Sequence, residues 1–179
     1  MDQTKEVVMS ERLGGTTIKG KPLTLVGPEI HVGEPVPDIE VLDNNFLPVK
    51  LSAFKGKVCV ISTVYSLETP VCDKQTHQFN EGIGKLGPNA IVLTVSMDLP
   101  FAQKRWCGAA AQVCTLSDYK DANFGRAFGV LIKESRMLAR AVFVVDKKGI
   151  VRYVQYVKEL TDHPDYDKAL SAVEKLLKE

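Results

Sequence analysis

An uninterrupted apolar run at residues 58–64, V-C-V-I-S-T-V, is the feature that most restricts the fold of this chain. It is rich in β-branched residues and lacks the polar–apolar alternation of a strand with one solvated face. Such a run is typical of a strand buried on both faces. Ala90–Val95 has the same character. A chain of 179 residues is long enough to build one ordinary domain around these strands.

Helical patterns separate the buried strands. Residues 71–86 place apolar side chains close to helical spacing, and Asp165–Leu177 is amphipathic. The other expected elements are a hairpin of Thr16–Ile18 and Leu23–Val26, a strand near Ile39–Leu42, helices over Phe101–Ala111 and Asp121–Phe128, and strands over Val113–Leu116, Ala141–Val145 and Ile150–Val157. This order predicts a mixed α/β sheet covered on both faces. We expect residues 1–15 to form a polar N-terminal extension and residues 16–179 a single domain.

Composition and charge exclude several classes of protein. The formal net charge is +1, so no global field attracts nucleic acid or anionic lipid, and neither is expected as a partner. No apolar run approaches the ~18–20 residues of a membrane span. The first fifteen residues lack the apolar core of a signal peptide, so a cytoplasmic location is expected.

Four cysteines stand at positions 59, 72, 107 and 114, and no two have the C-x-x-C spacing. With no His, Cys or Asp cluster at metal-ligand spacing, we expect no metal and no cofactor. Each cysteine is therefore either a buried apolar side chain or a reactive thiol. Cys59 lies inside an apolar strand and is expected in the core. Cys114 also lies in a strand-like segment, and a role as an alternative resolving cysteine stays open for it.

Cys72 lies at a strand-to-helix junction. Thr69 is a good N-cap and Pro70 suits the first helical position, so Val71 and Cys72 follow as the second and third helical residues. The sulfur is then expected beside unpaired backbone N–H groups at the positive end of the helix dipole, which stabilises a thiolate. Asp73 opposes this by repelling negative charge. From these residues alone, Cys72 is either a reactive thiol or a small side chain filling a helix start.

Five segments in order resemble one family, the peroxiredoxins, and more narrowly its bacterial thiol peroxidase subfamily. They are G-K-P-L-T-L-V-G (20–27), L-E-T-P-V-C (67–72), S-M-D-L-P-F-A-Q-K-R-W-C (96–107), F-G-V (128–130) and L-A-R-A-V-F-V-V-D (138–146). The resemblance implies a thioredoxin-like fold with an N-terminal β-hairpin, a homodimer, and thioredoxin as the reductant.

The resemblance also assigns roles to residues. Cys72 matches the peroxidatic cysteine, Thr69 the hydroxyl of the T-x-x-C motif, Cys107 the resolving cysteine and Arg140 the active-site arginine. It implies that hydroperoxides oxidise Cys72 to a sulfenic acid, which Cys107 converts to an intramolecular disulfide. We expect the helix around each cysteine to unwind locally for this step, and the fluorescence of Trp106 to report it. Without the resemblance, Arg140 would be interpreted as a surface arginine on a strand.

One position departs from the family motif P-x-x-x-T/S-x-x-C, because Tyr65 stands where the proline is expected. The family proline shields the sulfur from water and shapes the pocket. A tyrosine ring can also cover the thiolate, or it can narrow the pocket. We expect Tyr65, Pro70 and Val71 to line the substrate pocket, and the change to affect rate and substrate range more than fold.

Three other functions compete with the peroxidase. A disulfide oxidoreductase or redox-sensing protein of the same fold is disfavoured by the absence of C-x-x-C, and it would leave Thr69 and Arg140 without a purpose. A cysteine hydrolase needs a histidine base, and no motif places one beside Cys72. In the third, the protein is an interaction module and Cys72 is inert.

Overall fold

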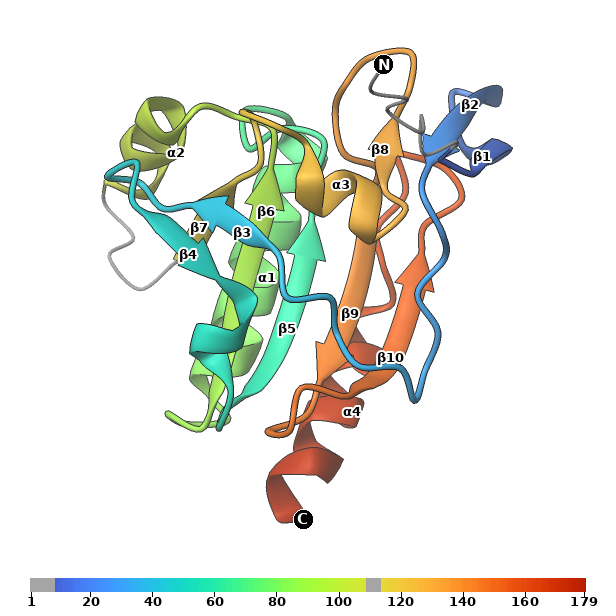
Figure 1. Ribbon diagram of the computed structural model, residues 1–179. Coiled ribbons are helices and arrows are strands. Elements are labelled where there is room, and N and C mark those ends of the chain that lie inside the picture. The colour runs from blue at the N-terminus through green and yellow to red at the C-terminus, as the bar shows by residue number, and fades with distance from the viewer. Residues whose placement is uncertain (1–8, 109–113) are drawn as a thin grey trace, which may run out of the picture.

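The computed structural model describes residues 9–108 and 114–179. The strands are β1 (Glu11–Ile18), β2 (Lys21–Val26), β3 (Glu40–Leu42), β4 (Pro48–Lys50), β5 (Val58–Thr63), β6 (Ala90–Ser96), β7 (Cys114–Ser117), β8 (Leu131–Ile132), β9 (Ala141–Val145) and β10 (Val151–Tyr156). The helices are α1 (Pro70–Gly84), α2 (Pro100–Cys107), α3 (Asn123–Ala127) and α4 (Tyr166–Lys178), with a 3₁₀ turn at Leu51–Phe54. Figure 1 shows one large sheet with a small sheet beside its β10 edge.

The large sheet has the strand order β10-β9-β5-β6-β7-β3-β4, and the small sheet has the order β1-β2-β8. β5 pairs in parallel with β6, and β6 in parallel with β7. β9 runs antiparallel to β5 and to β10. The sheet is therefore mixed, as the order of elements predicted.

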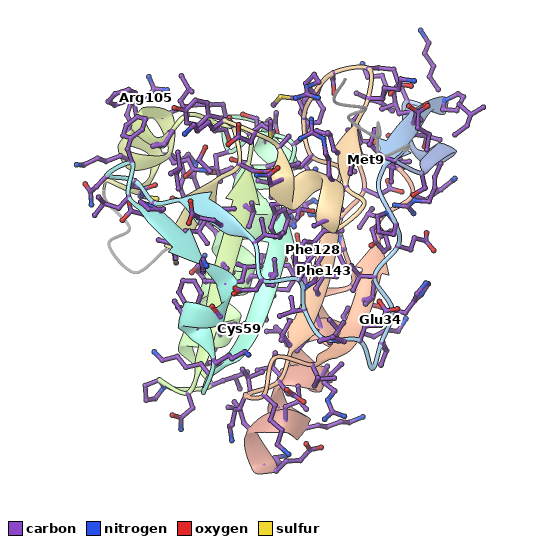
Figure 2. All side chains as sticks on the ribbon, in the orientation of Figure 1. Met9, Glu34, Cys59, Arg105, Phe128 and Phe143 are labelled. Atoms are coloured by element: carbon purple, nitrogen blue, oxygen red, sulfur yellow. The ribbon has the colours of Figure 1, made fainter. Side chains whose placement is uncertain are left out.

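β5 is an interior strand of the large sheet, between β9 and β6, and all six of its residues are buried. On one face, Val58 and Val60 pack with Phe79 of α1 and Val173 of α4. On the other face, Ile61 belongs to a second cluster that includes aromatic residues of and next to α3 and β9. Figure 2 shows two of these, Phe128 and Phe143, side by side in front of the sheet, and their ring centroids are 5.2 Å apart. Covering on both faces explains why this strand has no polar alternation.

The extended segment before β5 contributes more than one short strand. β3 pairs antiparallel with both β4 and β7, so this segment forms an edge of the large sheet. β4 and β8 were not predicted. With three and two residues respectively, they are too short to show a period-2 pattern, and the pairing of β8 depends on β2, which is distant in the chain.

The N-terminal hairpin begins earlier than expected, because β1 starts at Glu11 rather than Thr16. Arg12 gives the physical reason. Its guanidinium donates to the carbonyl oxygens of Gly27 and Gly129 and pairs with Glu29, and it lies 5.2 Å from the centre of the Tyr156 ring. These partners are far away in sequence, so no local pattern could indicate that residues 11–15 are held in a strand.

Two other boundaries differ from the sequence prediction. α2 ends at Cys107 with Gly108 as its cap, whereas the helical pattern was extended to Ala111. β7 begins at Cys114 and continues to Ser117. The remainder of the predicted helix, and Val113, lie outside the described residues.

Candidate active site

Cys72 lies at the third position of α1, as predicted, and is fully buried. Pro70 occupies the first helical position and Thr69 is the N-cap residue. Helix geometry leaves the first amide groups without a carbonyl acceptor in the preceding turn, so Val71 and Cys72 present N–H groups near the sulfur. The amino end of α1 therefore stabilises negative charge at this position.

Thr69 is at the N-cap position, but its side chain does not cap the helix. Its hydroxyl donates instead to the carbonyl oxygen of Ser66, at 3.0 Å. The same loop is fixed by Asp98, whose carboxylate accepts from the Ser66 hydroxyl at 2.7 Å and from the Leu67 amide at 2.8 Å. The connection between β5 and α1, directly before the helix that carries Cys72, is thus held in one conformation.

Arg140 lies immediately before β9 and is buried, with 2% of its surface exposed. Its Nη2 atom lies 3.4 Å from Cys72 Sγ. Nη2 and Nε also donate to the carbonyl oxygen of Leu160, at 2.8 and 3.2 Å. In the described part of the chain its hydrogen-bond acceptors are this carbonyl, an amide oxygen and the sulfur. Among these acceptors only the sulfur can carry a negative charge, which is what a buried cation requires as a partner.

Gln75 supplies the amide oxygen and was missed by the sequence analysis. It is fully buried, and its Oε1 accepts from Arg140 Nη1. Its Nε2 donates to the Ser62 hydroxyl at 2.7 Å, which fixes the oxygen toward the arginine. The available signal was its spacing: three residues after Cys72, it falls on the face of α1 that carries Phe79.

The three residues predicted to line the substrate pocket have different surroundings. Tyr65 is half-buried and packs against an apolar cluster of Val64, Leu67 and Cys72. Val71 is half-buried, whereas Pro70 is exposed. Tyr65 therefore contributes an aromatic cover to the cluster that contains the sulfur, although it stands at the position of the family proline.

Cys107 is the last residue of α2, and 9% of its surface is exposed. Its Sγ lies 3.2 Å from Thr115 Oγ1 and accepts from Asn44 Nδ2 at 3.7 Å. These partners belong to β7 and to the turn after β3, whereas Cys72 faces Arg140. All four cysteines are free thiols in this structure.

Contacts between α1 and α2 join the neighbours of the two cysteines. Trp106 Nε1 donates to Asp73 Oδ1 at 2.9 Å, and the Trp106 ring lies 5.1 Å from the His77 ring. Arg105, on the outer surface of α2 in Figure 2, pairs with Glu68 at 2.5 Å. The Asp73 carboxylate, which was expected to oppose the thiolate, thus accepts a hydrogen bond from the neighbour of Cys107.

The other two cysteines are poor nucleophiles. Burial raises the pKa of Cys59 to about 12, and the charge of Cys114 adds to the rise. Burial also raises the pKa of Cys114 to about 11, with a further contribution from the charge of Cys107. Because the thiolate is the reactive form, these raised pKa values disfavour reaction of either thiol at neutral pH.

Residues 9–108 and 114–179 also bear on metal binding and membrane insertion. Neither histidines, cysteines nor carboxylates come together there in groups of three that could hold a metal ion. The helices described there are also too short or too polar to cross a bilayer.

Comparisons with known proteins identify the family of this chain. The family model described as Redoxin matches residues 31–170. The thiol peroxidase of Bacillus subtilis (strain 168) is 53% identical over 164 residues, which cover 90% of this chain and 98% of the relative. The thiol peroxidase of Halalkalibacterium halodurans is 52% identical over 167 residues, covering 92% of this chain and 100% of the relative.

Solved structures agree on the fold. A peroxiredoxin-like protein from Aquifex aeolicus superposes with a TM-score of 0.83 at 43% identity, covering 94% of this chain and 98% of its own. A thiol peroxidase from Chromobacterium violaceum has a TM-score of 0.80 at 20% identity, covering 91% of this chain and 95% of its own, and supports the fold alone. The thioredoxin-like fold is therefore confirmed. The chain belongs to the Redoxin family and, within it, to the bacterial thiol peroxidase subfamily of the peroxiredoxins, which are thiol-dependent peroxidases.

Proposed function

We propose that Cys72 is the peroxidatic cysteine of this thiol-dependent peroxidase and that Cys107 is its resolving cysteine. The observation that carries the proposal is the 3.4 Å approach of Arg140 Nη2 to the buried Cys72 sulfur. A guanidinium and the amino end of α1 both stabilise negative charge at the same atom. Cys59 and Cys114 lack these partners and have raised pKa values.

In the first step, the Cys72 thiolate attacks the terminal oxygen of ROOH. The S–O bond forms as the O–O bond breaks, and the departing RO⁻ takes a proton and leaves as ROH. Cys72 is left as a sulfenic acid. Arg140 and the amide groups at the start of α1 stabilise the charge that develops on the oxygens. Because the Thr69 hydroxyl donates to Ser66, its oxygen retains lone pairs that accept a hydrogen bond from the hydroxyl group of the peroxide.

In the second step, the Cys107 thiol attacks the Cys72 sulfenic acid. An S–S bond forms and water leaves. The two sulfurs face different partners, so the first turn of α1 and the last turn of α2 unwind until the Cα atoms of Cys72 and Cys107 are within roughly 7 Å. A dithiol reductant then exchanges with this disulfide, becoming oxidised as both cysteines return to thiols. We propose thioredoxin as that reductant.

The proposal extends to assembly and location. The residues from β1 onward form one catalytic domain, and two copies form a homodimer in the cytoplasm. An exposed apolar surface at the start of α2 supports self-association: Phe101 is 71% exposed and Leu99 is 48% exposed. The ring of Phe46 lies 4.5 Å from that of Phe101. Sedimentation of Phe101→Asp beside the unmodified protein tests the dimer, and unchanged sedimentation would locate the interface elsewhere.

Disulfide mapping tests the two cysteine assignments. The reduced protein is mixed with one equivalent of hydroperoxide, quenched with an alkylating agent and digested for mass spectrometry. We expect a Cys72–Cys107 link, no peroxide consumption by Cys72→Ser, and a single turnover by Cys107→Ser. Cys114→Ser is the matched control and should cycle normally. Peroxide reduction by Cys72→Ser, or a link that includes Cys114, would refute the assignment.

A further inference from the structure

The segment 157–161 holds Arg140 from one side. The Val157 amide donates to the Arg140 carbonyl oxygen at 3.0 Å. The Leu160 carbonyl oxygen accepts from both Nε and Nη2 of the guanidinium. Nη2 is also the atom that lies 3.4 Å from Cys72 Sγ. The Leu160 carbonyl, together with Gln75, therefore fixes where the cation lies relative to the sulfur.

The N-terminal hairpin holds the same segment from the other side. The Thr17 amide donates to the Lys158 carbonyl at 2.7 Å, and the Leu160 amide donates to the Thr17 carbonyl at 2.8 Å. The Thr16 hydroxyl is within 3.2 Å of the Val157 carbonyl. β10 ends at Tyr156, so the segment 157–161 lies beyond the strand pairing of β10. Its position depends on its bridge to β1.

The Glu159 carboxylate connects the segment 157–161 to the hairpin. It accepts from the amides of Lys19 and Gly20, both at 3.0 Å, and from the Thr17 hydroxyl at 2.8 Å. The amide and hydroxyl of Thr161 add two more bonds, at 3.2 and 3.0 Å. Lys19 and Gly20 have φ angles of +49° and +76°, so this turn presents successive amides to one anion. The Gly20 amide is the largest of the influences that lower the pKa of Glu159 to about 2.

We propose that Glu159 is a positioning residue for the peroxidatic site: it anchors the segment 157–161 to the hairpin turn and so fixes the Leu160 carbonyl that directs Arg140 toward Cys72. The inference rests on the proposed roles of Cys72 and Arg140. Glu159 itself has no contact with the sulfur, so its effect is transmitted through the neighbouring peptide group. A carboxylate with five donors resists displacement more than the neutral amide of glutamine, which presents only one oxygen to them.

Glu159→Gln tests the proposal with two readouts. The first is the rate of peroxide reduction at neutral pH, which we expect to fall about fivefold because a displaced guanidinium keeps only part of a charge-assisted hydrogen bond to the thiolate. The second is the pH midpoint for alkylation of Cys72, which we expect to move upward by about half a pH unit for the same reason. Thr17→Val removes one donor to the carboxylate and should shift both readouts less, in the same direction.

Asp146→Asn is the matched control. Its carboxylate also fixes a turn, accepting from the amides of Lys148 and Ile150 at 2.9 and 3.0 Å and from Arg152 at 2.6 Å. This turn lies at the opposite end of β9 from Arg140. If Glu159 served only stability, both variants would lower the melting temperature and leave the alkylation midpoint unchanged, and that result would overturn the proposal.

Arg140→Met separates this inference from the function on which it rests. In the Arg140→Met background, adding Glu159→Gln should produce no further shift of the midpoint, because the group being positioned is absent. A full additional shift would overturn the positioning role. If Arg140→Met alone changed neither rate nor midpoint, the proposed site would fail together with the inference. Normal behaviour of Glu159→Gln and Thr17→Val beside an impaired Arg140→Met would overturn the inference only.

Discussion

Trp106→Phe should accelerate disulfide formation after Cys72 has been oxidised. The indole of Trp106 donates to Asp73 at 2.9 Å, and its ring packs against the cluster that contains Cys72. The two bonded residues are the direct neighbours of Cys107 and Cys72. The hydrogen bond between Trp106 and Asp73 must break when the first turn of α1 and the last turn of α2 unwind. Phenylalanine keeps most of the ring and removes the donor.

The magnitude follows from the exposure of this contact. A hydrogen bond to a charged group contributes roughly 1.5–3 kcal/mol when it is shielded from water. The Asp73 side chain is 47% exposed, so a value of about 1 kcal/mol is appropriate. If local unwinding precedes the attack of Cys107, its equilibrium constant rises by the same free energy. The rate of disulfide formation should then increase about fivefold.

Rapid-quench alkylation measures this rate. Reduced protein is mixed with one equivalent of hydroperoxide, quenched at intervals, and the Cys72–Cys107 link is quantified by mass spectrometry. Arg105→Gln is the control, because its ion pair with Glu68 is between side chains that are 74% and 56% exposed and contributes little. A Trp106→Phe rate equal to or below that of the unmodified protein would refute the idea that this contact restrains the resolving step.

Three further predictions concern Gln75, the two remaining cysteines and Glu159. Gln75→Leu should slow peroxide reduction about tenfold, because Arg140 loses a charge-assisted hydrogen bond, and stopped-flow measurement of peroxide loss checks this. In the native reduced protein at neutral pH, Cys59 should resist alkylation and Cys114 should react only slowly, as labelling followed by mass spectrometry would show. Folding lowers the pKa of Glu159 from its ordinary value of 4.5, so its carboxylate stabilises the folded state at pH values above 4.5. Chemical unfolding should therefore show Glu159→Gln losing less stability than the unmodified protein as pH falls from 4.5 toward 2.

The parts of the fold that the sequence could predict are those with local periodic signals. β5 and β6 are recognisable because burial on two faces requires continuous apolar residues, and α4 because Leu170, Val173 and Leu177 repeat at helical spacing. The turn at Asp146–Gly149 is recognisable because the Asp146 side chain accepts a hydrogen bond from an amide of the turn and Gly149 adopts a positive φ angle. β4 and β8 have no such signal, since they have only three and two residues, and β8 is defined by a partner strand, β2, far away in the chain.

The candidate site divides in the same way. The placement of Cys72 at the third position of α1 follows from Thr69 and Pro70, which act on their immediate neighbours. The approach of Arg140 was implied by family resemblance, and no local pattern could show that its guanidinium lies beside a sulfur 68 residues away. Gln75 was missed because a buried glutamine on a helix resembles a surface residue until its tertiary partners are known.

The two cysteines proposed to form the disulfide are held by different contacts, and we expect this difference to separate the two steps of the reaction. Cys72 faces a buried guanidinium, which is fixed by Gln75 and the Leu160 carbonyl in the interior. Cys107 lies at the end of α2, whose link to α1 consists of Trp106 and exposed side chains. Changes near Glu159 should therefore alter the reaction with peroxide and leave disulfide formation unchanged, whereas Trp106→Phe should do the reverse. A variant of either kind that changed both rates equally would show that the site responds as one unit, and the proposed division would be wrong.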